Sequence, residues 1–346
     1  MISANPRIAQ PAAAVEPARD WRRLWREAVT EPSELLQLLG LDGLTERLPA
    51  DSAGFPLRVP RGFVARMRHG DPTDPLLRQV LPLDLETLAV EGFGLDAVGD
   101  AAARSGRGVL QKYRGRALLV ATGSCAVHCR YCFRRHYPYG EDSAAANAWQ
   151  AALHAIEADP SVDEVILSGG DPLSLSTAKL RELGDRLRAL PQVRRLRIHS
   201  RLPVVLPERV DAELLDWLAD LPLQKVMVIH ANHAREFDES VARALADLRT
   251  AGLTVLNQAV LLRGINDTVE DQVELAEAGF AAGALPYYLH QLDRVAGAAH
   301  FEVPDADALA IESALRKRLP GYLVPRLVRE VAGAASKLPL SIATES

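Results

Sequence analysis

Short apolar runs alternate with amphipathic helical patterns from about residue 110 onward, and this alternation constrains the fold more than any other feature of the chain. After the first interval, the runs recur at roughly 30 residues, the size of one βα unit. We predict strands at Ala117–Thr122, Glu164–Ser168, Arg195–His199, Lys225–His230, Thr254–Val260 and Ala284–Leu289. We predict helices at Ala144–Ala158, Thr177–Leu190, Asp211–Ala219, Glu239–Ala251, Val269–Ala282 and Ala306–Arg318.

This pattern predicts an α/β protein, because strands that alternate with helices form a parallel sheet covered by helices. Six units indicate a partial (β/α)6 barrel of the TIM type, and an eight-stranded closed barrel is the alternative. Helical patterns from Trp21 to Leu48 and from Pro60 to Arg68 precede these units. We therefore expect a mainly helical extension at 1–108, a barrel at 109–320 and a short C-terminal segment at 321–346.

Polar and ionisable residues follow every predicted strand. In α/β barrels the carboxyl ends of the strands meet at one face, where active sites lie. Glycines such as Gly169 and Gly170 let the backbone approach a ligand there, because they have no Cβ. We therefore expect one site built from these groups: Cys125–Cys132, Ser168–Asp171, His199–Arg201, His230–His233, Gln258 and Tyr287–Asp293.

Cys125, Cys129 and Cys132 form a C-x3-C-x2-C pattern, and the chain has no other cysteine. Three thiolates can bind three irons of a [4Fe–4S] cluster and leave the fourth iron open to a substrate or cofactor. A disulfide framework is disfavoured, because it needs an even count and an oxidising compartment. A structural zinc site needs four ligands, and His128 or His136 could supply the fourth. We predict the cluster and keep zinc as the alternative.

The overall composition excludes several classes of protein. The net charge is −5, so no basic excess indicates nucleic-acid binding. No apolar run approaches the roughly 20 residues of a membrane span. Because an exposed cluster favours a reducing compartment, we expect the protein in the cytoplasm.

Two cationic residues have candidate roles in binding an amino acid and a carbonyl cofactor. Arg134 lies two residues after the last cysteine, and a guanidinium can hold a carboxylate through two parallel hydrogen bonds. Lys337 is one of only five lysines in a chain whose positive charge is mainly arginine. An amine at this position can form a Schiff base, whereas a guanidinium cannot.

A series of motifs along the chain indicates the family to which it is similar. Tyr131, an aromatic residue directly before the third cysteine, is typical of radical S-adenosylmethionine enzymes. From about Asp74 to Lys337 the chain resembles the lysine 2,3-aminomutase family within that group. The motifs are Asp74-Pro-Leu-Leu-Arg78-Gln79, Arg116-Ala-Leu-Leu-Val120, Ser168-Gly-Gly-Asp171, Arg201-Leu-Pro-Val-Val-Leu-Pro207, His230-Ala-Asn-His233, Asn257-Gln258 through Asn266-Asp267, Pro286-Tyr-Tyr288 and Ala299-His-Phe301.

This resemblance implies a [4Fe–4S] cluster, S-adenosylmethionine and pyridoxal 5′-phosphate as cofactors, and residues that hold them. Cys125, Cys129 and Cys132 would ligate the cluster, and Lys337 would hold pyridoxal phosphate covalently. Arg134 would bind the substrate α-carboxylate. Asp293 and Glu330 would bind its ε-ammonium group. The other cofactor-binding residues would be Tyr113, Arg116, Tyr131, Ser168, Gly169, Gly170, Asp171, Arg201, His230, Gln258 and His290, with His230 and Gln258 at the adenosyl group.

The resemblance further implies conversion of (S)-α-lysine to (R)-β-lysine, with electrons from a flavodoxin or ferredoxin. Two positions depart from the free-lysine mutases, because Glu330 replaces an aspartate and His290 a tyrosine. Trp21, Trp25, the segment Phe133–Tyr139 and the short chain end after Lys337 resemble the branch that supplies β-lysine to a ligase for elongation factor P. Alternatives are a catabolic lysine mutase, a mutase for glutamate or arginine, and an iron–sulfur electron-transfer protein.

Overall fold

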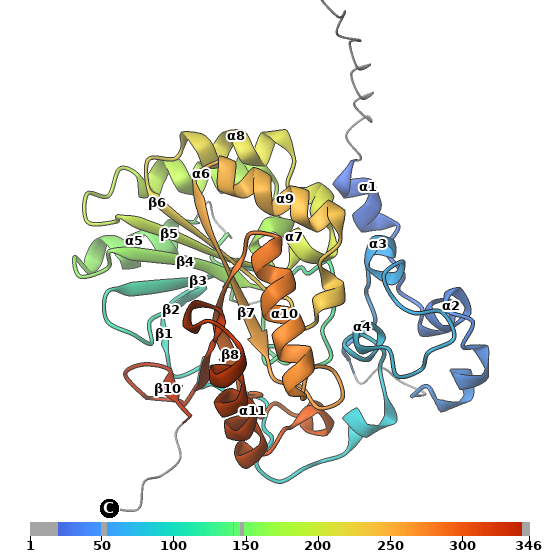
Figure 1. Cartoon of the computed structure of the whole chain (residues 1–346). Helices are drawn as coiled ribbons and strands as arrows, with labels where there is room; N and C mark the ends of the chain where they lie inside the picture. Colours follow the sequence, from blue (N-terminus) through green and yellow to red (C-terminus); the bar gives the residue numbers. More distant parts are fainter. Residues whose placement is uncertain (1–19, 50–53, 141, 146–148, 341–346) are drawn as a thin grey trace, which may run out of the picture.

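A single curved sheet organises the molecule in the computed structural model, which describes residues 20–49, 54–140, 142–145 and 149–340. Seven neighbouring strands, β3 to β9, run parallel, and each pairs with the next in chain order (Figure 1). Their bounds are β3 Arg116–Thr122, β4 Glu164–Gly169, β5 Arg195–Ser200, β6 Gln224–Ile229, β7 Leu253–Val260, β8 Leu285–His290 and β9 Arg326–Arg329. The six predicted strands are confirmed, and β9 is an addition that the sequence analysis did not include.

Helices connect these strands and cover the outer face of the sheet (Figure 1). Their bounds are α5 Gln150–Ala158, α6 Thr177–Leu187, α7 Leu202–Val205, α8 Ala212–Asp220, α9 Glu239–Thr250, α10 Val269–Ala281 and α11 Asp305–Arg318. Side chains of Ser176, Asp211, Asp238 and Thr268 accept backbone N–H bonds at the starts of α6, α8, α9 and α10. These caps explain why the helices begin where the sequence predicts them. The predicted helix Ala144–Ala158 is too long, because α5 begins only at Gln150.

The sheet is open, so the partial barrel is confirmed and the closed eight-stranded barrel is wrong. Short antiparallel strands β1 (Arg104–Gly106) and β2 (Val109–Leu110) extend one edge beside β3. At the other edge β10 (Leu338–Pro339) pairs antiparallel with β9. Among the described residues β1 and β10 are the two ends of the strand order. The β9–β10 turn returns the chain so that Lys337 lies near the end of β9.

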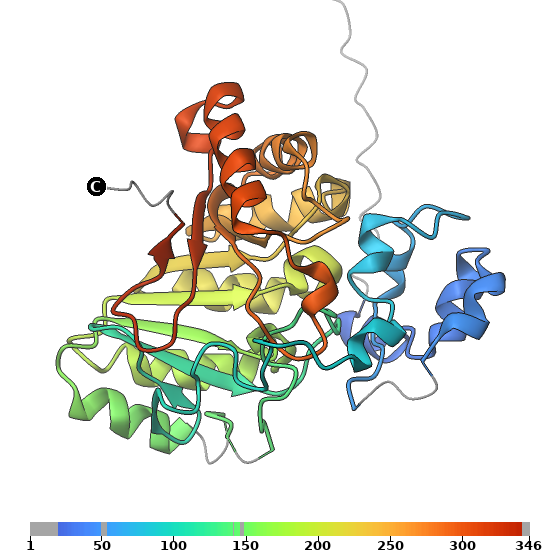
Figure 2. The same ribbon diagram turned by 90° about the horizontal axis from the view of Figure 1, so that it is seen from below.

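The segments before the barrel lie at one side of it (Figure 2). They contain α1 Trp21–Arg26, α2 Pro32–Leu38, η1 Asp42–Arg47, α3 Arg61–Val64, α4 Pro75–Arg78 and η2 Asp84–Thr87. Asp20 caps α1, and Asp74 caps α4 by accepting from two backbone N–H groups. Residues 1–19 and 341–346 of the two expected end segments lie outside the described residues. In the part of the chain that the structure describes, no helix has the length and apolar character to cross a bilayer.

Candidate active site

One cavity of about 570 Å³ is lined by residues at the carboxyl ends of the parallel strands and by others nearer their starts, such as Arg116, the first residue of β3. Side chains alternate along a strand, so every second residue faces the barrel interior. Along β5 this places Arg197 and His199 in the cavity, while Leu196 and Ile198 are buried in the core. The cavity wall includes every residue to which the family resemblance gave a role: Tyr113, Arg116, Cys125, Cys129, Tyr131, Cys132, Arg134, Ser168, Gly169, Gly170, Asp171, Arg201, His230, Gln258, His290, Asp293, Glu330 and Lys337. Of the other polar residues expected at the strand ends, Asn232, His233 and Gln291 are not part of this wall.

The three cysteines lie on the loop that follows β3, and all three thiols reach the cavity. Within this loop Cys132 N donates to Cys129 O at 3.0 Å. Burial and the neighbouring Cys129 together raise the pKa of the Cys132 thiol to about 11. Burial raises the pKa of Cys125 well above its ordinary value, and the neighbouring Cys132, Asp171 and Cys129 contribute to this increase. Thiols crowded together away from water therefore need a cationic partner to ionise, which the irons of a cluster would provide.

Three thiols on one loop are the ligand set of a cluster with one open iron, whereas a structural zinc ion would need a fourth ligand beside them. Within the described residues, no three His, Cys, Asp or Glu side chains are grouped closely enough to ligate one metal ion. A cluster differs, because each of its thiolates binds a separate iron. The histidines considered as zinc ligands are also engaged with backbone carbonyls: His128 Nδ1 lies 2.8 Å from Pro56 O, and His136 Nε2 lies 3.1 Å from Ala296 O.

Segments before the barrel hold the cysteine loop in place. Arg130 N donates to Gln79 O at 2.9 Å, and His128 N donates to Arg58 O at 2.9 Å. Glu86 is buried between two arginines of the loop, accepting from Arg130 Nε and Arg135 Nη2, each at 2.8 Å. Although burial alone would raise the pKa of Glu86, the two guanidinium groups hold it below its ordinary value. The sequence analysis missed Glu86, because it lies in a stretch without helical or strand periodicity.

Backbone packing explains why positions 169 and 170 are glycines, independently of any ligand. Gly169 has φ 120°, and a Cβ there would lie 2.8 Å from Thr122 O. A Cβ on Gly170 would lie 2.6 Å from Ser124 O. The backbone thus closes tightly on the start of the cysteine loop, with Gly170 N donating to Thr122 O at 2.7 Å. Packing alone therefore requires glycine at both positions, because the space a Cβ would fill is occupied by protein backbone, and their role in ligand binding stays a prediction.

The Asp171 carboxylate joins the ends of two strands. It accepts from Ser200 Oγ at 2.7 Å and from the backbone N–H groups of Leu173, Arg201 and Leu202. Burial raises its pKa to about 6, although these bonds favour the charged form. Both oxygens are engaged within the protein, so Asp171 positions the loop after β5, and its role in ligand binding stays a prediction.

Arg134 is buried and shared between two partners. Its Nε donates to Asp100 Oδ2 at 2.7 Å, and its Nη1 donates to Ser168 Oγ at 3.0 Å. Lys112 Nζ lies 2.8 Å from the other oxygen of Asp100. Asp100 thus fixes the Nε side of the guanidinium. A substrate carboxylate would have to bind at the Nη end.

Lys337 projects its amine toward Glu330, with Nζ 2.7 Å from Oε2. Tyr113 donates its hydroxyl to Glu330 Oε1 at 2.8 Å, and Lys112 Nζ lies 3.5 Å from the same oxygen. Although burial opposes it, the Lys337 ammonium lowers the pKa of Glu330. Lys337 also lies over the Tyr288 ring, 5.8 Å from its centroid.

The same cavity suits pyridoxal phosphate, because it combines an amine with cationic and hydrogen-bonding groups. Arg116 and Arg197 line it and share the Glu164 carboxylate, at 3.5 and 2.5 Å. Such guanidinium groups match the geometry of a phosphate. The sequence analysis missed Arg197. It could have been found from the alternation along its strand, which places it on the same face as His199.

Buried histidines and polar atoms that lack hydrogen-bond partners form another part of the cavity wall. Burial lowers the pKa of His230 to about 4 and holds those of His199 and His290 well below the ordinary value. His290 Nε2 and Gln258 Oε1 are buried without a hydrogen-bond partner among the described residues. Buried polar atoms of this kind require partners, which the polar atoms of a cofactor can supply.

Asp293 lies in the same cavity near Lys337 and Glu330. Burial raises its pKa to about 7; Lys337 opposes this shift, and the negative charge of Glu330 adds to it. A cationic ligand beside Asp293 would reverse the shift by stabilising the carboxylate.

Comparisons with known proteins agree with this site. The model of the Radical SAM superfamily matches residues 119–276. The chain is 48% identical to the L-lysine 2,3-aminomutase of Escherichia coli (strain K12), over 93% of this chain and 95% of that protein. It is 43% identical to the enzyme of the same name from Haemophilus influenzae, over 96% and 98%. It is 32% identical to that of Clostridium subterminale, over 93% and 77%.

Proposed function

Because the chain belongs to the L-lysine 2,3-aminomutase family of radical SAM isomerases, we propose that it converts (S)-α-lysine to (R)-β-lysine. One observation carries this proposal: three thiols, the amine of Lys337 and opposite charges for both ends of lysine line the same cavity. The membership implies a [4Fe–4S] cluster, S-adenosylmethionine and pyridoxal phosphate. When bound, these groups supply a carbon radical and a π-system that delocalises the unpaired electron.

We assign the cofactor-holding residues as follows. Cys125, Cys129 and Cys132 ligate the cluster, and Lys337 anchors pyridoxal phosphate. The phosphate lies toward Arg116 and Arg197, with Tyr113 alongside. The remaining wall binds S-adenosylmethionine and the cofactor ring through these residues: Tyr131, Ser168, Gly169, Gly170, Asp171, Arg201, His230, Gln258 and His290.

The protein positions lysine by holding both of its ends. The Nη end of Arg134 binds the α-carboxylate, while Asp100 keeps the guanidinium from turning. Asp293 and Glu330 bind the ε-ammonium group. Glu330 Oε2 contacts Lys337 Nζ in the free protein. This oxygen can therefore bind the substrate ammonium group only after the Lys337 amine has turned away from it. Fixing both ends removes most of the orientational freedom of a flexible substrate.

Charge supports lysine over the alternative substrates. Asp293 and Glu330 line the same cavity as Arg134, so it offers carboxylates to a cationic side chain and a guanidinium to a carboxylate. Glutamate would place a second anion beside two carboxylates and is disfavoured. Arginine is cationic and remains the second candidate.

We further propose that the product serves a ligase that modifies elongation factor P. The segment Phe133–Tyr139 and the residues around Lys337 resemble the branch with that role. A flavodoxin or ferredoxin would supply the electron. We propose the cytoplasm as the location, since an oxygen-sensitive cluster is maintained in a reducing compartment.

The decisive experiment is anaerobic turnover of the reconstituted protein with S-adenosylmethionine, pyridoxal phosphate, dithionite and (S)-α-lysine, followed by chiral analysis. We expect (R)-β-lysine, with glutamate and arginine as matched substrates that react at least tenfold more slowly. Full iron loading without β-lysine would overturn the proposal. The modification state of elongation factor P in cells that lack this protein then tests the branch, because the catabolic alternative predicts that the β-lysyl group is still attached.

A further inference from the structure

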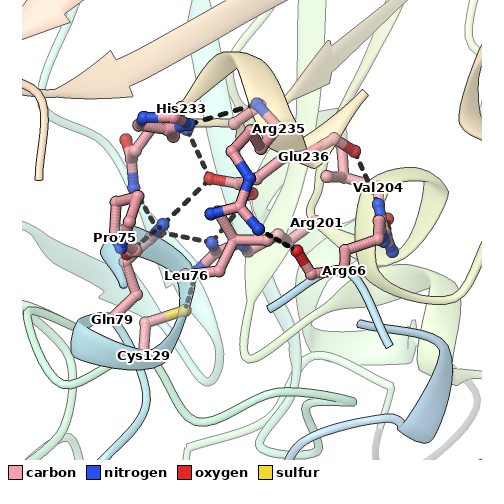
Figure 3. A network of polar contacts seen from close by, with 12 residues as sticks. Arg66, Pro75, Leu76, Gln79, Cys129, Arg201, Val204, His233, Arg235 and Glu236 are labelled. Carbon is pink, nitrogen blue, oxygen red and sulfur yellow. Dashed lines mark hydrogen bonds and ion pairs between the residues drawn. The ribbon is translucent and has the colours of Figure 1, made fainter. Parts of the chain in front are cut away.

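Arg201 connects a cluster-binding cysteine to a buried polar network. Its Nη1 lies 2.8 Å from Cys129 Sγ and donates to Tyr131 OH at 2.7 Å. Its Nη2 donates to Gln79 Oε1 at 2.6 Å and to Glu236 Oε2 at 3.0 Å (Figure 3). Arg201 follows β5, so its guanidinium spans the distance from a barrel strand to the cysteine loop.

Gln79 and Glu236 bind this guanidinium, and Asn232 bonds to both of them; we refer to Gln79, Asn232 and Glu236 as the Arg201 clamp. Each is at most 1% exposed. Gln79 Nε2 and Asn232 N both donate to Glu236 Oε1, at 3.0 and 2.9 Å. Asn232 Nδ2 donates to Gln79 Oε1 at 3.0 Å and to Tyr131 OH at 2.6 Å. The clamp draws on α4, on the turn after β6 and on η6 (Ala234–Glu236), so it forms only in the folded chain.

We propose that the Arg201 clamp sets the reduction potential of the iron–sulfur cluster by fixing the Arg201 guanidinium against Cys129 Sγ. This inference rests on the proposed function, since it assumes the cluster. Hydrogen bonds and positive charge at a cluster sulfur stabilise the reduced form, which carries one more negative charge. The cluster takes up one electron from the reductant, and no bond at Arg201 forms or breaks.

The buried charges make opposite contributions. Arg201 favours reduction because its charge lies against the sulfur that gains electron density. Glu236 opposes reduction, because it balances that charge from the far side of the guanidinium. Interactions between buried charges are weakly screened, so both contributions persist in ordinary salt. A residue that merely supports the loop would have no such signed effect.

The test compares the reconstituted wild-type protein with Arg201→Gln and Glu236→Gln, all without S-adenosylmethionine. Iron content is measured first, and the fraction of reduced cluster is then followed by electron paramagnetic resonance against poised dithionite. We expect Arg201→Gln to lower the equilibrium constant for reduction at least tenfold, which is about 59 mV for one electron. We expect Glu236→Gln to raise it. Arg316→Gln, on the exposed side of α11, is the charge-matched control and should leave it unchanged.

The outcomes separate the inference from its premise. Opposite shifts with full iron content support a potential-setting role. Unchanged potentials, shifts of the same sign, or equal loss of iron in both variants would overturn it in favour of a structural role. If only Arg201→Gln fails to bind iron, the test depends on Glu236→Gln: a higher equilibrium constant for reduction supports the inference, and an unchanged or lower one overturns it. A wild-type protein that binds no cluster would overturn the proposed function as well.

Discussion

Lys337 Nζ lies 2.7 Å from Glu330 Oε2, although the two residues are seven positions apart in the chain. The turn between β9 and β10 produces this contact by returning the chain antiparallel to itself. In the free protein the Lys337 amine, which is expected to anchor a cofactor, is therefore paired with the Glu330 carboxylate, which is expected to bind substrate. Loading the cofactor would separate the pair and prepare Glu330 for a second ammonium group.

Replacing Lys337 by alanine should abolish covalent pyridoxal phosphate binding and reduce turnover at least a thousandfold, because this variant lacks the amine assigned to the Schiff base. The measurement is borohydride trapping followed by peptide mass analysis. Lys317→Ala, on the exposed surface of α11, is the control and should retain the modified peptide. Trapping of the cofactor at Lys112 in the wild-type protein would disprove the assignment.

The affinity for lysine should increase with pH around neutrality. The pKa of Asp293 is about 7 in the free protein, so a proton must leave before the carboxylate attracts an ammonium group. We expect KM for lysine to fall about tenfold from pH 6 to pH 8, as the ionised fraction rises. Asp293→Asn should bind lysine weakly at both pH values. A KM in this variant that still falls tenfold would show that another group titrates.

The same shift has a consequence for stability. The folded protein keeps the Asp293 proton up to pH 7, whereas the unfolded chain loses it near pH 4. The folded state therefore binds more protons between these values, and this group's contribution to stability falls as pH rises through that window. Compared with wild type, the metal-free Asp293→Asn protein should lose less stability between pH 5 and pH 8 in urea unfolding.

Removing the charge of Glu86 should unfold the cysteine loop. Glu86→Gln leaves the buried guanidinium groups of Arg130 and Arg135 without their anion, which we expect to cost about 3–5 kcal/mol. The checks are urea denaturation of the metal-free protein and iron content after reconstitution. Glu312→Gln breaks the exposed pair with Arg316 and should cost less than about 1 kcal/mol. Equal effects in the two variants would refute the loop assignment.

A methyl group at Gly170 should displace the start of the cysteine loop. Its Cβ would lie 2.6 Å from Ser124 O, a backbone atom that cannot move without the loop. Gly170→Ala should lower stability by about 1–3 kcal/mol and reduce iron uptake. Gly62→Ala is the matched control, because a Cβ there meets nothing within 4 Å. Normal iron uptake in Gly170→Ala would show that the loop tolerates this crowding.

The sequence by itself determined the order of strands and helices and the residues that gather at the site. Strand and helix periodicity located six strands to within one residue at each end, because buried βα units leave a strong alternation of apolar residues. Since parallel strands all end at one edge, residues as distant as Cys125 and Asp293 were expected in one site, and both line the cavity. Lys337 was expected there from the family resemblance, and it lines the same cavity.

Only the tertiary structure decided which groups pair within that site. Glu86, Gln79 and Glu236 lie in stretches with no periodic signal, yet they hold the cysteine loop and Arg201. The strand β9 and the contact between Lys337 and Glu330 likewise depend on a chain reversal at the sheet edge. Periodicity reports which face of an element is buried, whereas pairing of charges depends on distances between segments that the order of residues does not contain.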